Sequence, residues 1–258
     1  MARVFVTGSS DGLGLMAGEL LAAQGHAVTL HARSEARAKD AKRALPAAEH
    51  VLVGDLSTIG VMKSVAEQAN ATGPFDAVIH NVGLGYRAPK RVETADGLEQ
   101  VFAVNVLAPY VLTALMKRPS RLVYLSSGMH RGGTTNIDDP LWASRRWNGS
   151  QAYSDSKLQD VWLAFAIARK WPSTLSNAVH PGWVPTKMGG ASAPDDLEKG
   201  ALTQAWLAVS DDPNAKVSGK YFFHQREYRV LAEANDTRLQ DQLVSYCARL
   251  TGIDLPSA

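Results

Sequence analysis

The sequence has little of several features that mark whole classes of protein. Cys247 is the only cysteine among 258 residues, which excludes an internal disulfide framework and a thiolate metal cluster. The seven histidines show no metal-ligand spacing, so we predict no metal site. No apolar run reaches the roughly 20 residues that span a bilayer, and residues 1–8 lead straight into a strand without room for a signal peptide. The net charge of +2 gives no global field that favours nucleic acid or membranes. We therefore expect a cytoplasmic protein with neither kind of partner.

What the sequence does contain is a regular alternation of short β-branched runs and longer helical patterns. Several runs lack polar alternation, as expected for parallel strands covered on both faces. The alternation predicts one α/β domain over 1–258, a doubly wound Rossmann-type fold with a sheet of seven mostly parallel strands and helices on both faces. The expected strands are Arg3–Val6, Ala27–His31, His50–Val53, Phe75–His80, Arg121–Leu125, Leu175–Val179 and Lys220–Phe223. The expected helices are Leu13–Gln24, Glu35–Leu45, Thr58–Ala71, Ala95–Met116, Gln151–Lys170, Asp195–Val209 and Asp236–Leu250.

Two segments, 128–149 and 183–199, break this rhythm. Long irregular segments in a compact domain are usually binding loops or lids. The first segment has no clean period, and surface decoration is an equally good interpretation of it. The second follows the end of a strand, which favours a lid. Tryptophans in both segments suggest an apolar pocket and arginines in the first suggest an anion, so the identity of the substrate stays open.

A glycine-rich turn, Thr7–Gly14, lies between the first predicted strand and the first helix. Glycines at such a junction allow a tight turn and a close approach of the backbone to a pyrophosphate at a helix N-terminus. The spacing T-G-x-x-x-G-x-G resembles that of the classical short-chain dehydrogenase/reductase family, and the resemblance covers almost the whole chain. It implies a nicotinamide coenzyme, with the candidate ligands Gly8, Ser9, Ser10, Gly12, Leu13 and Gly14.

The end of the second strand bears on the choice of coenzyme. Family members that use NAD carry a carboxylate there, whereas this chain has Arg33 followed by Ser34. A guanidinium group pairs with phosphate in fork geometry, which favours the 2′-phosphate of NADP. Asp11 in the turn argues the other way, and Arg33 could also be a solvated residue that opens a helix. We predict NADP, with NAD as the alternative.

The resemblance implies further coenzyme contacts at the ends of the third, fourth and sixth strands. In the family, residues there contact the adenine, the adenosine and the nicotinamide in turn. The matching residues here are Asp55, Leu56, Asn81, Gly83, Pro181, Gly182, Val184 and Thr186. One motif departs from the family pattern, because His80-Asn81-Val82-Gly83 replaces Asn-Asn-Ala-Gly. Some of the packing around the adenosine must therefore differ.

Tyr153 and Lys157 form the family's Tyr-x-x-x-Lys pattern. Residues four apart lie on one face of a helix, so the ammonium group sits beside the phenol. A free tyrosine has a pKa near 10, and a neighbouring cation favours the phenolate. Such a pair is common on ordinary helices, but here it accompanies the turn and the matching strands. The resemblance assigns proton transfer to Tyr153, and ribose binding together with tuning of Tyr153 to Lys157.

Two more residues complete the catalytic set that the resemblance implies. Ser127 follows the fifth strand and would steady the substrate oxygen, whereas Ser126 would satisfy backbone groups. Ser127 and Tyr153 stand 26 positions apart, a long separation shared with retinol-dehydrogenase-like and protochlorophyllide-reductase-like branches. Asn105 would hold a water that links Lys157 to solvent. Pro109 cannot donate to the Asn105 carbonyl four residues earlier, so we expect the helix to kink there.

Taken together, these patterns favour an NAD(P)-dependent enzyme that interconverts a carbonyl and an alcohol of a small-molecule substrate. A non-catalytic dinucleotide-binding redox sensor is the alternative, although such proteins tend to lose the tyrosine or the lysine. A nucleotide-sugar epimerase shares the pair, but usually carries a longer C-terminal substrate domain. The helical segment 161–168 is apolar on every side, which one sheet-facing stripe does not require. We expect it to form the interface of a homodimer or homotetramer, unless the chain's own insertion covers it.

Overall fold

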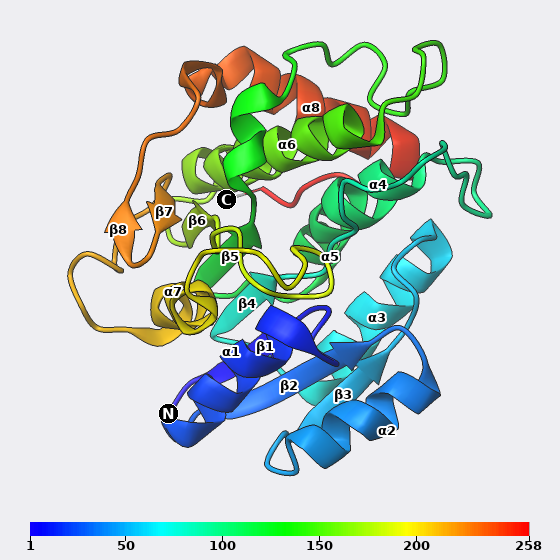
Figure 1. Cartoon of the computed structure of the whole chain (residues 1–258). Coiled ribbons are helices and arrows are strands. Elements are labelled where there is room, and N and C mark those ends of the chain that lie inside the picture. Colours follow the sequence, from blue (N-terminus) through cyan, green and yellow to red (C-terminus); the bar gives the residue numbers. More distant parts are fainter. Residues whose placement is uncertain (258) are drawn as a thin grey trace.

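The apolar strand runs pair into one eight-stranded sheet in a computed structural model that describes residues 1–257 (Figure 1). The strand order is β3-β2-β1-β4-β5-β6-β7-β8, and every pair is parallel except the last. The order reverses direction between β1 and β4, which makes this edge the topological switch point. The strands are β1 Arg3–Val6, β2 Ala27–Ala32, β3 His50–Val53, β4 Ala77–His80, β5 Arg121–Leu125, β6 Leu175–Val179, β7 Tyr221–Phe223 and β8 Arg226–Glu227.

The eighth strand corrects the prediction of seven. β8 is an exposed two-residue strand that returns antiparallel to β7, with Phe222 opposite Glu227. Its turn residues, His224 and Gln225, have φ angles of 46° and 61°. Turns with positive φ normally use glycine, asparagine or aspartate. The turn therefore lacks the residues by which a hairpin is recognised in a sequence.

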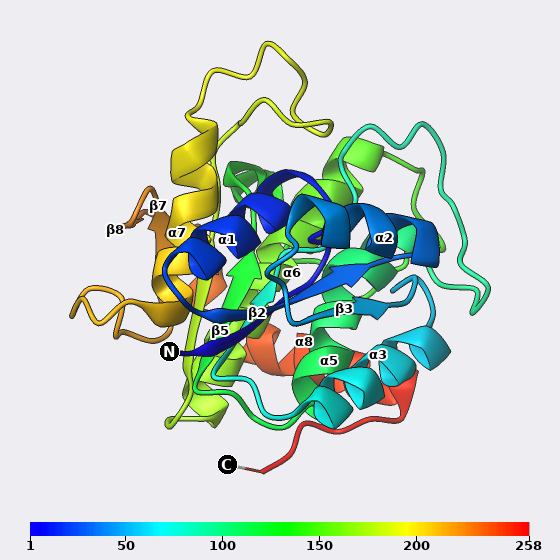
Figure 2. The ribbon, with the colours of Figure 1, turned by 90° about the horizontal axis from the view of Figure 1, so that it is seen from below.

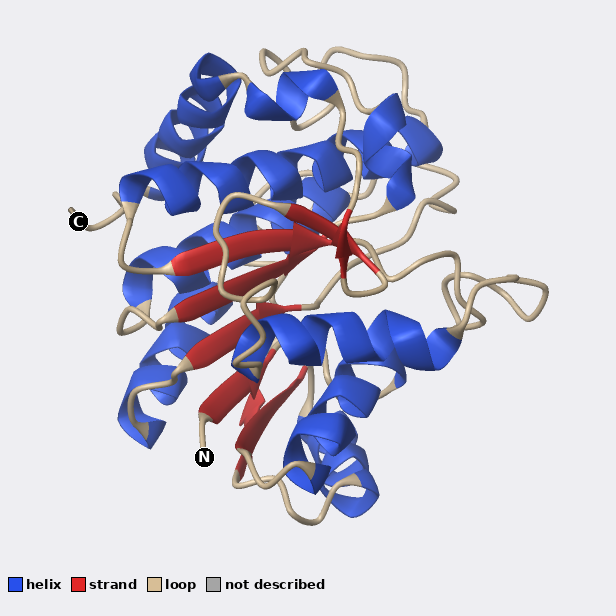
Figure 3. Cartoon of the chain, turned by 90° about the vertical axis from the view of Figure 1, so that its left-hand side faces the viewer, coloured by secondary structure: helices blue, strands red, loops and turns tan. Residues whose placement is uncertain are grey.

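Helices cover both faces of the sheet (Figure 3). One layer consists of α1, α2 and α7 (Figure 2). The other layer consists of α3, α6 and the segment made of α4, the π turn η1 (Ala103–Leu107) and α5, and α8 packs on the outside of α6. Each layer has its own apolar core against the sheet. The helices are α1 Gly12–Ala23, α2 Glu35–Ala44, α3 Ile59–Thr72, α4 Gln100–Phe102, α5 Ala108–Leu115, α6 Gly149–Lys170, α7 Leu197–Val209 and α8 Thr237–Thr251. None of the helices within residues 1–257 is long and apolar enough to cross a membrane.

Polar side chains set where several helices begin. Ser34, Thr58, Asn148 and Asp196 each accept a backbone N–H from the first turn of α2, α3, α6 and α7, respectively. Such caps satisfy donors that have no partner within the helix. The cap at Asn148 starts α6 two residues before the predicted boundary, so that the helix carrying Tyr153 has a full turn before it.

The expected helix over 95–116 is wrong at its start and interrupted within. Residues before Gln100 are not helical, since Glu93 and Glu99 form an isolated antiparallel bridge. The helix then passes through a π-helical turn, η1 Ala103–Leu107, before it continues as α5. Single π turns inserted in α-helices often mark functional sites. The interruption expected around Asn105 thus takes the form of a π turn directly before Pro109.

The apolar helix that suggested self-association is covered within the chain. Residues 161–167 of α6 are buried, and α8 packs along α6 together with the 3₁₀ helices η2 Gly128–Gly132 and η3 Ala232–Asn235. The Trp162 indole N–H donates to the Glu233 carbonyl in η3 at 3.0 Å. Packing inside one chain therefore accounts for the apolar character of α6, and its cover comes both from the C-terminal helix α8 and from η2 at the start of the 128–149 insertion.

Candidate active site

The predicted site residues gather at the carboxyl ends of the central strands. The turn that follows β1 and the segment that follows β4 lie against each other, because Asn81 and Val82 donate their backbone N–H groups to Thr7 Oγ1 at 3.0 and 3.1 Å. In open α/β sheets, ligands bind outside the carboxyl ends of the strands at such a switch point. The fold thus places the glycine-rich turn where a dinucleotide would be held.

At two positions in this turn, neighbouring atoms lie too close to the backbone for any residue other than glycine. Gly8 has a φ of 60°, and a Cβ atom there would lie 2.8 Å from Val82 Cα. A Cβ atom at Gly14 would overlap the Asn81 amide and lie 2.6 Å from the Gly8 carbonyl oxygen. The Asn81 amide in turn donates to the Thr7 and Gly8 carbonyls at 2.9 and 3.0 Å. The turn is therefore packed directly onto the end of β4, and the Asn81 side chain braces it.

Buried polar groups hold the turn from the other side. Ser9 Oγ donates to the Val6 carbonyl at 2.7 Å and accepts the His31 backbone N–H at 2.8 Å, so this hydroxyl is used within the protein. His31 Nδ1 accepts the Gly8 N–H, and its Nε2 lies 2.9 Å from the Gly54 carbonyl. This arrangement requires a neutral ring protonated on Nε2. Burial lowers the pKa of His31 to about 4, against a partial rise from the Gly54 carbonyl.

Positive charge surrounds the turn from two elements. Arg37, on α2, donates to Asp11 Oδ2 at 2.7 Å and to Ser10 Oγ at 3.3 Å. Lys187 pairs with the same carboxylate at 2.5 Å. The Lys187 ammonium, together with Arg37, holds the pKa of Asp11 below its ordinary value. The carboxylate that argued against NADP is thus offset by two cations, while Arg33 is exposed directly after β2.

The other predicted coenzyme residues lie along the same edge. Asp55 is exposed after β3 and Leu56 is buried behind it. A Cβ atom at Gly83 would lie 3.6 Å from both Asn105 Oδ1 and Lys157 Nζ, so the segment after β4 passes directly over the predicted catalytic groups. The structure therefore brings the coenzyme and catalytic predictions together around Gly83.

Tyr153 and Lys157 lie on the buried face of α6. Their side chains are side by side, with Lys157 Nζ 5.7 Å from the centre of the Tyr153 ring. Lys157 Nζ donates to the Leu125 carbonyl at the end of β5 at 2.8 Å and to Asp160 Oδ2 at 2.7 Å. Burial lowers the pKa of Lys157, but the charge of Asp160, the Tyr153 phenol and the hydrogen bond to Asp160 together outweigh burial, and the pKa is raised. Lys157 is therefore a protonated ammonium group beside the phenol at neutral pH.

The Asn105 side chain joins the π turn to the segment after β4 and to α6. Its Oδ1 accepts the Leu84 N–H at 2.7 Å, and its Nδ2 donates to the Leu84 carbonyl at 3.1 Å and to Ser156 Oγ at 3.0 Å. The amide is therefore fully engaged in holding Gly83 and Leu84 near Lys157. Its carbonyl, rather than its side chain, is the group that the predicted water relay would use.

The two serines after β5 have separate surroundings. Ser126 Oγ is buried and donates to the Lys157 carbonyl at 2.7 Å, as expected of a structural serine. Ser127 is partly exposed, and its Oγ accepts the Met129 N–H at 3.2 Å. The Ser127 carbonyl accepts the Tyr221 hydroxyl at 3.1 Å and faces His130 Nδ1 at 2.7 Å. The backbone of Ser127 is thus fixed from behind by a buried aromatic pair.

The segment after β6 contacts both the turn and Tyr153. The Gly182 N–H donates to His180 Nδ1, and His180 stacks on Phe223, so this histidine supports the segment. Val184 is buried, and Thr186 Oγ1 accepts the Gly189 N–H at 3.2 Å. Beyond them, Met188 Sδ lies 3.8 Å from the Tyr153 hydroxyl. The yellow loop ahead of α7 in Figure 1 therefore reaches across the predicted site.

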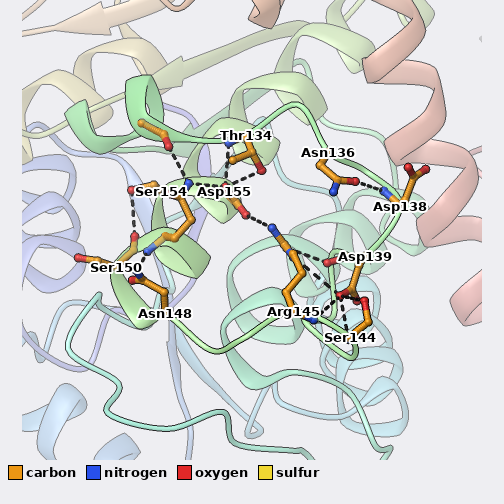
Figure 4. Close-up of polar contacts among 12 residues, drawn as sticks. Thr134, Asn136, Asp138, Asp139, Ser144, Arg145, Asn148, Ser150, Ser154 and Asp155 are labelled. Atoms are coloured by element: carbon orange, nitrogen blue, oxygen red, sulfur yellow. Dashed lines mark hydrogen bonds and ion pairs between the residues drawn. The ribbon is translucent and has the colours of Figure 1, made fainter.

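The insertion between Ser127 and Tyr153 is anchored to α6 through the middle of the Tyr-Ser-Asp-Ser-Lys motif (Figure 4). Asp155 accepts the Thr134 N–H at 2.8 Å and pairs with Arg145 at 3.2 Å. The Arg145 guanidinium also donates to the Asp139 carbonyl at 2.7 Å and lies 3.8 Å from the centre of the Trp142 ring. This arginine and the buried Trp142 therefore contact each other. Neither forms the anion site or the aromatic pocket that the arginines and tryptophans of the insertion suggested.

Sequence reasoning missed several residues of this region. His31, Arg37, Lys187 and Met188 contact the turn or Tyr153 from segments far away in the chain, and no local pattern marks them. Asp160 is different, since its place three residues after Lys157 put it on the same helical face. Within the described residues 1–257, no group of three or more histidine, cysteine, aspartate or glutamate side chains could hold a metal ion.

Comparison with known proteins agrees with this arrangement. A family model described as short chain dehydrogenase matches residues 2–197. The chain is 44% identical over 260 residues to the uncharacterized oxidoreductase AN7799 of Emericella nidulans, across 99% of both chains. It is 41% identical over 261 residues to the short-chain dehydrogenase chyC of Penicillium rubens, across the full length of both. A crystal structure of an uncharacterized protein from Mycobacterium paratuberculosis superposes with a TM-score of 0.84 at 26% identity, covering 99% of this chain and 95% of that one.

Proposed function

The chain belongs to the short-chain dehydrogenase/reductase family, and from this premise we propose that it interconverts a carbonyl and an alcohol by hydride transfer with NADP or NAD. Proteins of this family bind one of these two coenzymes. The observation that carries the proposal is the buried Tyr153–Lys157 pair, placed beside Gly83 and Asn105 at the switch point of the sheet.

The glycine-rich turn fits a dinucleotide. The contacts of Gly8 and Gly14 leave no room for side chains, so the backbone of the turn is bare at the N-terminus of α1. Backbone N–H groups and the helix dipole favour a pyrophosphate in that place. When bound, the nicotinamide supplies or accepts the hydride. The proposed coenzyme ligands are the turn, Asp55, Leu56, Asn81, Gly83, Lys157 and the segment Pro181–Thr186.

The proton is assigned to Tyr153. Its phenol would donate a proton to the substrate oxygen in reduction and take one in oxidation. The positive charge of Lys157 beside the ring would stabilise negative charge on the phenol oxygen while the proton moves. Ser127, after the carboxyl end of β5, would hold the same oxygen. The backbone carbonyl of Asn105 would order a water that links Lys157 to solvent. The substrate-side walls would be the lid 183–199 and the insertion 128–149.

NADP is the proposed coenzyme. Arg33 is exposed at the end of β2, where the 2′ position of the adenosine ribose would lie. Arg37 lies on the next turn of the same segment and already reaches Ser10 and Asp11. Two arginines around a site favour a phosphate dianion over a hydroxyl.

Self-association also stays a proposal. Because α8 covers α6, a homodimer or homotetramer would have to use a different surface from the one predicted. Light scattering at micromolar concentration measures the oligomeric state directly, and a strict monomer would refute the oligomer.

Replacement of Tyr153 by phenylalanine tests the chemistry. Tyr153→Phe should keep the fold and bind coenzyme, yet lose at least ~10²-fold in turnover, the usual scale for a lost acid-base group. A panel of carbonyls and alcohols with both coenzymes gives the assay, and coenzyme fluorescence gives the binding control. Tyr86→Phe is the matched control, because the Tyr86 ring lies 5.7 Å from that of Tyr153 and should leave turnover nearly unchanged. Near-normal turnover of Tyr153→Phe would refute the mechanism.

A further inference from the structure

Asp160 is a buried carboxyl group that the proposed chemistry does not use. Its Oδ2 accepts from Lys157 Nζ at 2.7 Å, and the two side chains are only 3% and 5% exposed. The residues are three apart on α6, so they share one face of the helix. Burying a charged group costs free energy unless it is paired. The burial of a carboxyl group against Lys157, a residue of the proposed active site, therefore needs an explanation.

The contacts of Lys157 show what this carboxyl group does to the ammonium group. An ammonium group has three N–H donors. Two are taken by the Leu125 carbonyl and by Asp160. These bonds fix the direction of the third, which is left for the side on which Gly83 lies. Asp160 thus determines where the positive charge stands relative to the Tyr153 ring.

The titratable groups that face this carboxyl group are Lys157 on its own helix and Tyr124 from β5. The Tyr124 hydroxyl is bonded to Thr113, which bonds His80 in turn, and burial raises the pKa of Tyr124. Tyr124 is therefore neutral at working pH, and only Lys157 supplies charge. Burial raises the pKa of Asp160 to about 7, against the opposing effect of Lys157. Without this carboxylate, only Tyr153 would oppose burial, which is the largest single influence on Lys157 and lowers its pKa.

We propose that Asp160 is a positioning residue for the reaction: its carboxylate fixes the ammonium group of Lys157 beside Tyr153 and keeps that group charged in alkaline solution. The role of Asp160 in turnover rests on the proposed function, whereas its hold on Lys157 does not. Below neutral pH, where Asp160 is itself uncharged, Lys157 keeps its proton without help. The contribution of Asp160 is therefore confined to neutral and alkaline pH.

Asp160→Asn removes the charge and keeps the shape. In alcohol oxidation, kcat/KM of this variant should match that of the wild type near pH 6. It should fall at least ~10-fold below the wild type near pH 9.5, since one unit between pKa and pH leaves a tenth of Lys157 charged. Asp160→Glu keeps the charge and should retain most of the wild-type alkaline activity. Asp155→Asn is the matched control, because it removes another buried carboxylate from α6, paired there with Arg145, and should change kcat/KM by the same factor at every pH.

A second measurement uses the coenzyme-free protein. In protein labelled with ¹³C at lysine Cε, the Lys157 signal is assigned by its absence from Lys157→Arg. In the wild type this signal should not titrate below about pH 10.5, the ordinary lysine value. In Asp160→Asn its midpoint should lie at least two units lower, at or below about pH 8.5, with thermal unfolding confirming that the variant is folded. An unchanged midpoint, or a loss of kcat/KM that is equal at all pH values, would overturn the proposal. If no substrate is turned over at all, the proposed function fails while the NMR titration still decides the role of Asp160.

Discussion

The turn after β1 and the lid after β6 both lie at the carboxyl end of the sheet, but they are held in different ways. Thr7, Ser9 and His31, which hold the turn, are at most 2% exposed. The lid reaches the site through Lys187 and Met188, whose contacts are at the surface: the Lys187 side chain is 85% exposed, and Met188 and Trp183 are exposed hydrophobic residues.

This difference has a physical consequence. Buried hydrogen bonds must break together with the packing around them, whereas exposed ion pairs contribute little to stability. We therefore expect the turn to keep its shape with or without a coenzyme, and the predicted lid to open without unfolding of the domain. The predictions below separate the two regions by the size of the effect that each should show.

The largest effect is expected from protonation of His31 beneath the turn. Because its folded-state pKa of about 4 lies below the ordinary 6.5, the neutral ring stabilises the fold above about pH 6.5. That stabilisation, about 3 kcal/mol for the shift, is lost as the pH falls from 6.5 toward 4. Urea unfolding at pH 7.5 and 4.5 should show a smaller acid loss in His31→Gln than in the wild type. His50→Gln, at an exposed histidine, should lose as much as the wild type, and equal losses in both variants would contradict the prediction.

Coenzyme choice should depend on Arg33, the exposed residue directly after β2. If its guanidinium group grips the 2′-phosphate, Arg33→Ala should weaken NADP binding by ~1.5–3 kcal/mol, the value of a charge-assisted bond, and barely affect NAD. Fluorescence titration with both coenzymes measures this. Arg43→Ala, at an arginine whose side chain is 78% exposed further along α2, is the control. An equal loss for both coenzymes, or a wild-type preference for NAD, would count against the assignment.

Packing of the turn onto β4 should make Gly14 intolerant of a side chain. Gly14→Ala would push a methyl group against the Gly8 carbonyl and the Asn81 amide, and should cost ~1–3 kcal/mol of unfolding free energy, as overpacking does. Coenzyme affinity should fall with it, because the backbone of the turn must shift. Gly60→Ala, at a helical glycine with open space around it, should instead stabilise by ~0.5–1 kcal/mol. A stable, coenzyme-binding Gly14→Ala protein would show that the turn is less rigid than its contacts indicate.

The smallest effect is expected on the lid. Lys187→Ala breaks an exposed ion pair with Asp11 and should change the unfolding free energy by no more than ~0.5 kcal/mol. The loop should nevertheless open more often, so chymotrypsin should cut faster after the exposed Trp183. A loss of stability as large as that caused by protonating His31 would erase the distinction between lid and turn.

The sequence by itself determined the features that depend on short spacing. Thr7–Gly14 follows one strand and opens one helix, and Tyr153 and Lys157 are one helical turn apart, so a local pattern is enough to place each of them. The alternation of apolar runs likewise indicated the class of the fold and the place along the chain of seven of its strands, because strands that alternate with helices form a mostly parallel sheet.

Only the tertiary structure decided what lies against these elements. The partners of Asp11 are 26 and 176 residues away. The cover of α6 comes from α8, η2 and η3 together, and β8 follows a turn without the usual turn residues. Each of these features depends on which surfaces meet when the chain folds. The residues next to a side chain in the sequence do not indicate a partner so distant along the chain. Asp160 is an intermediate case. Its spacing from Lys157 is visible in the sequence, whereas the burial of the pair is visible only in the structure.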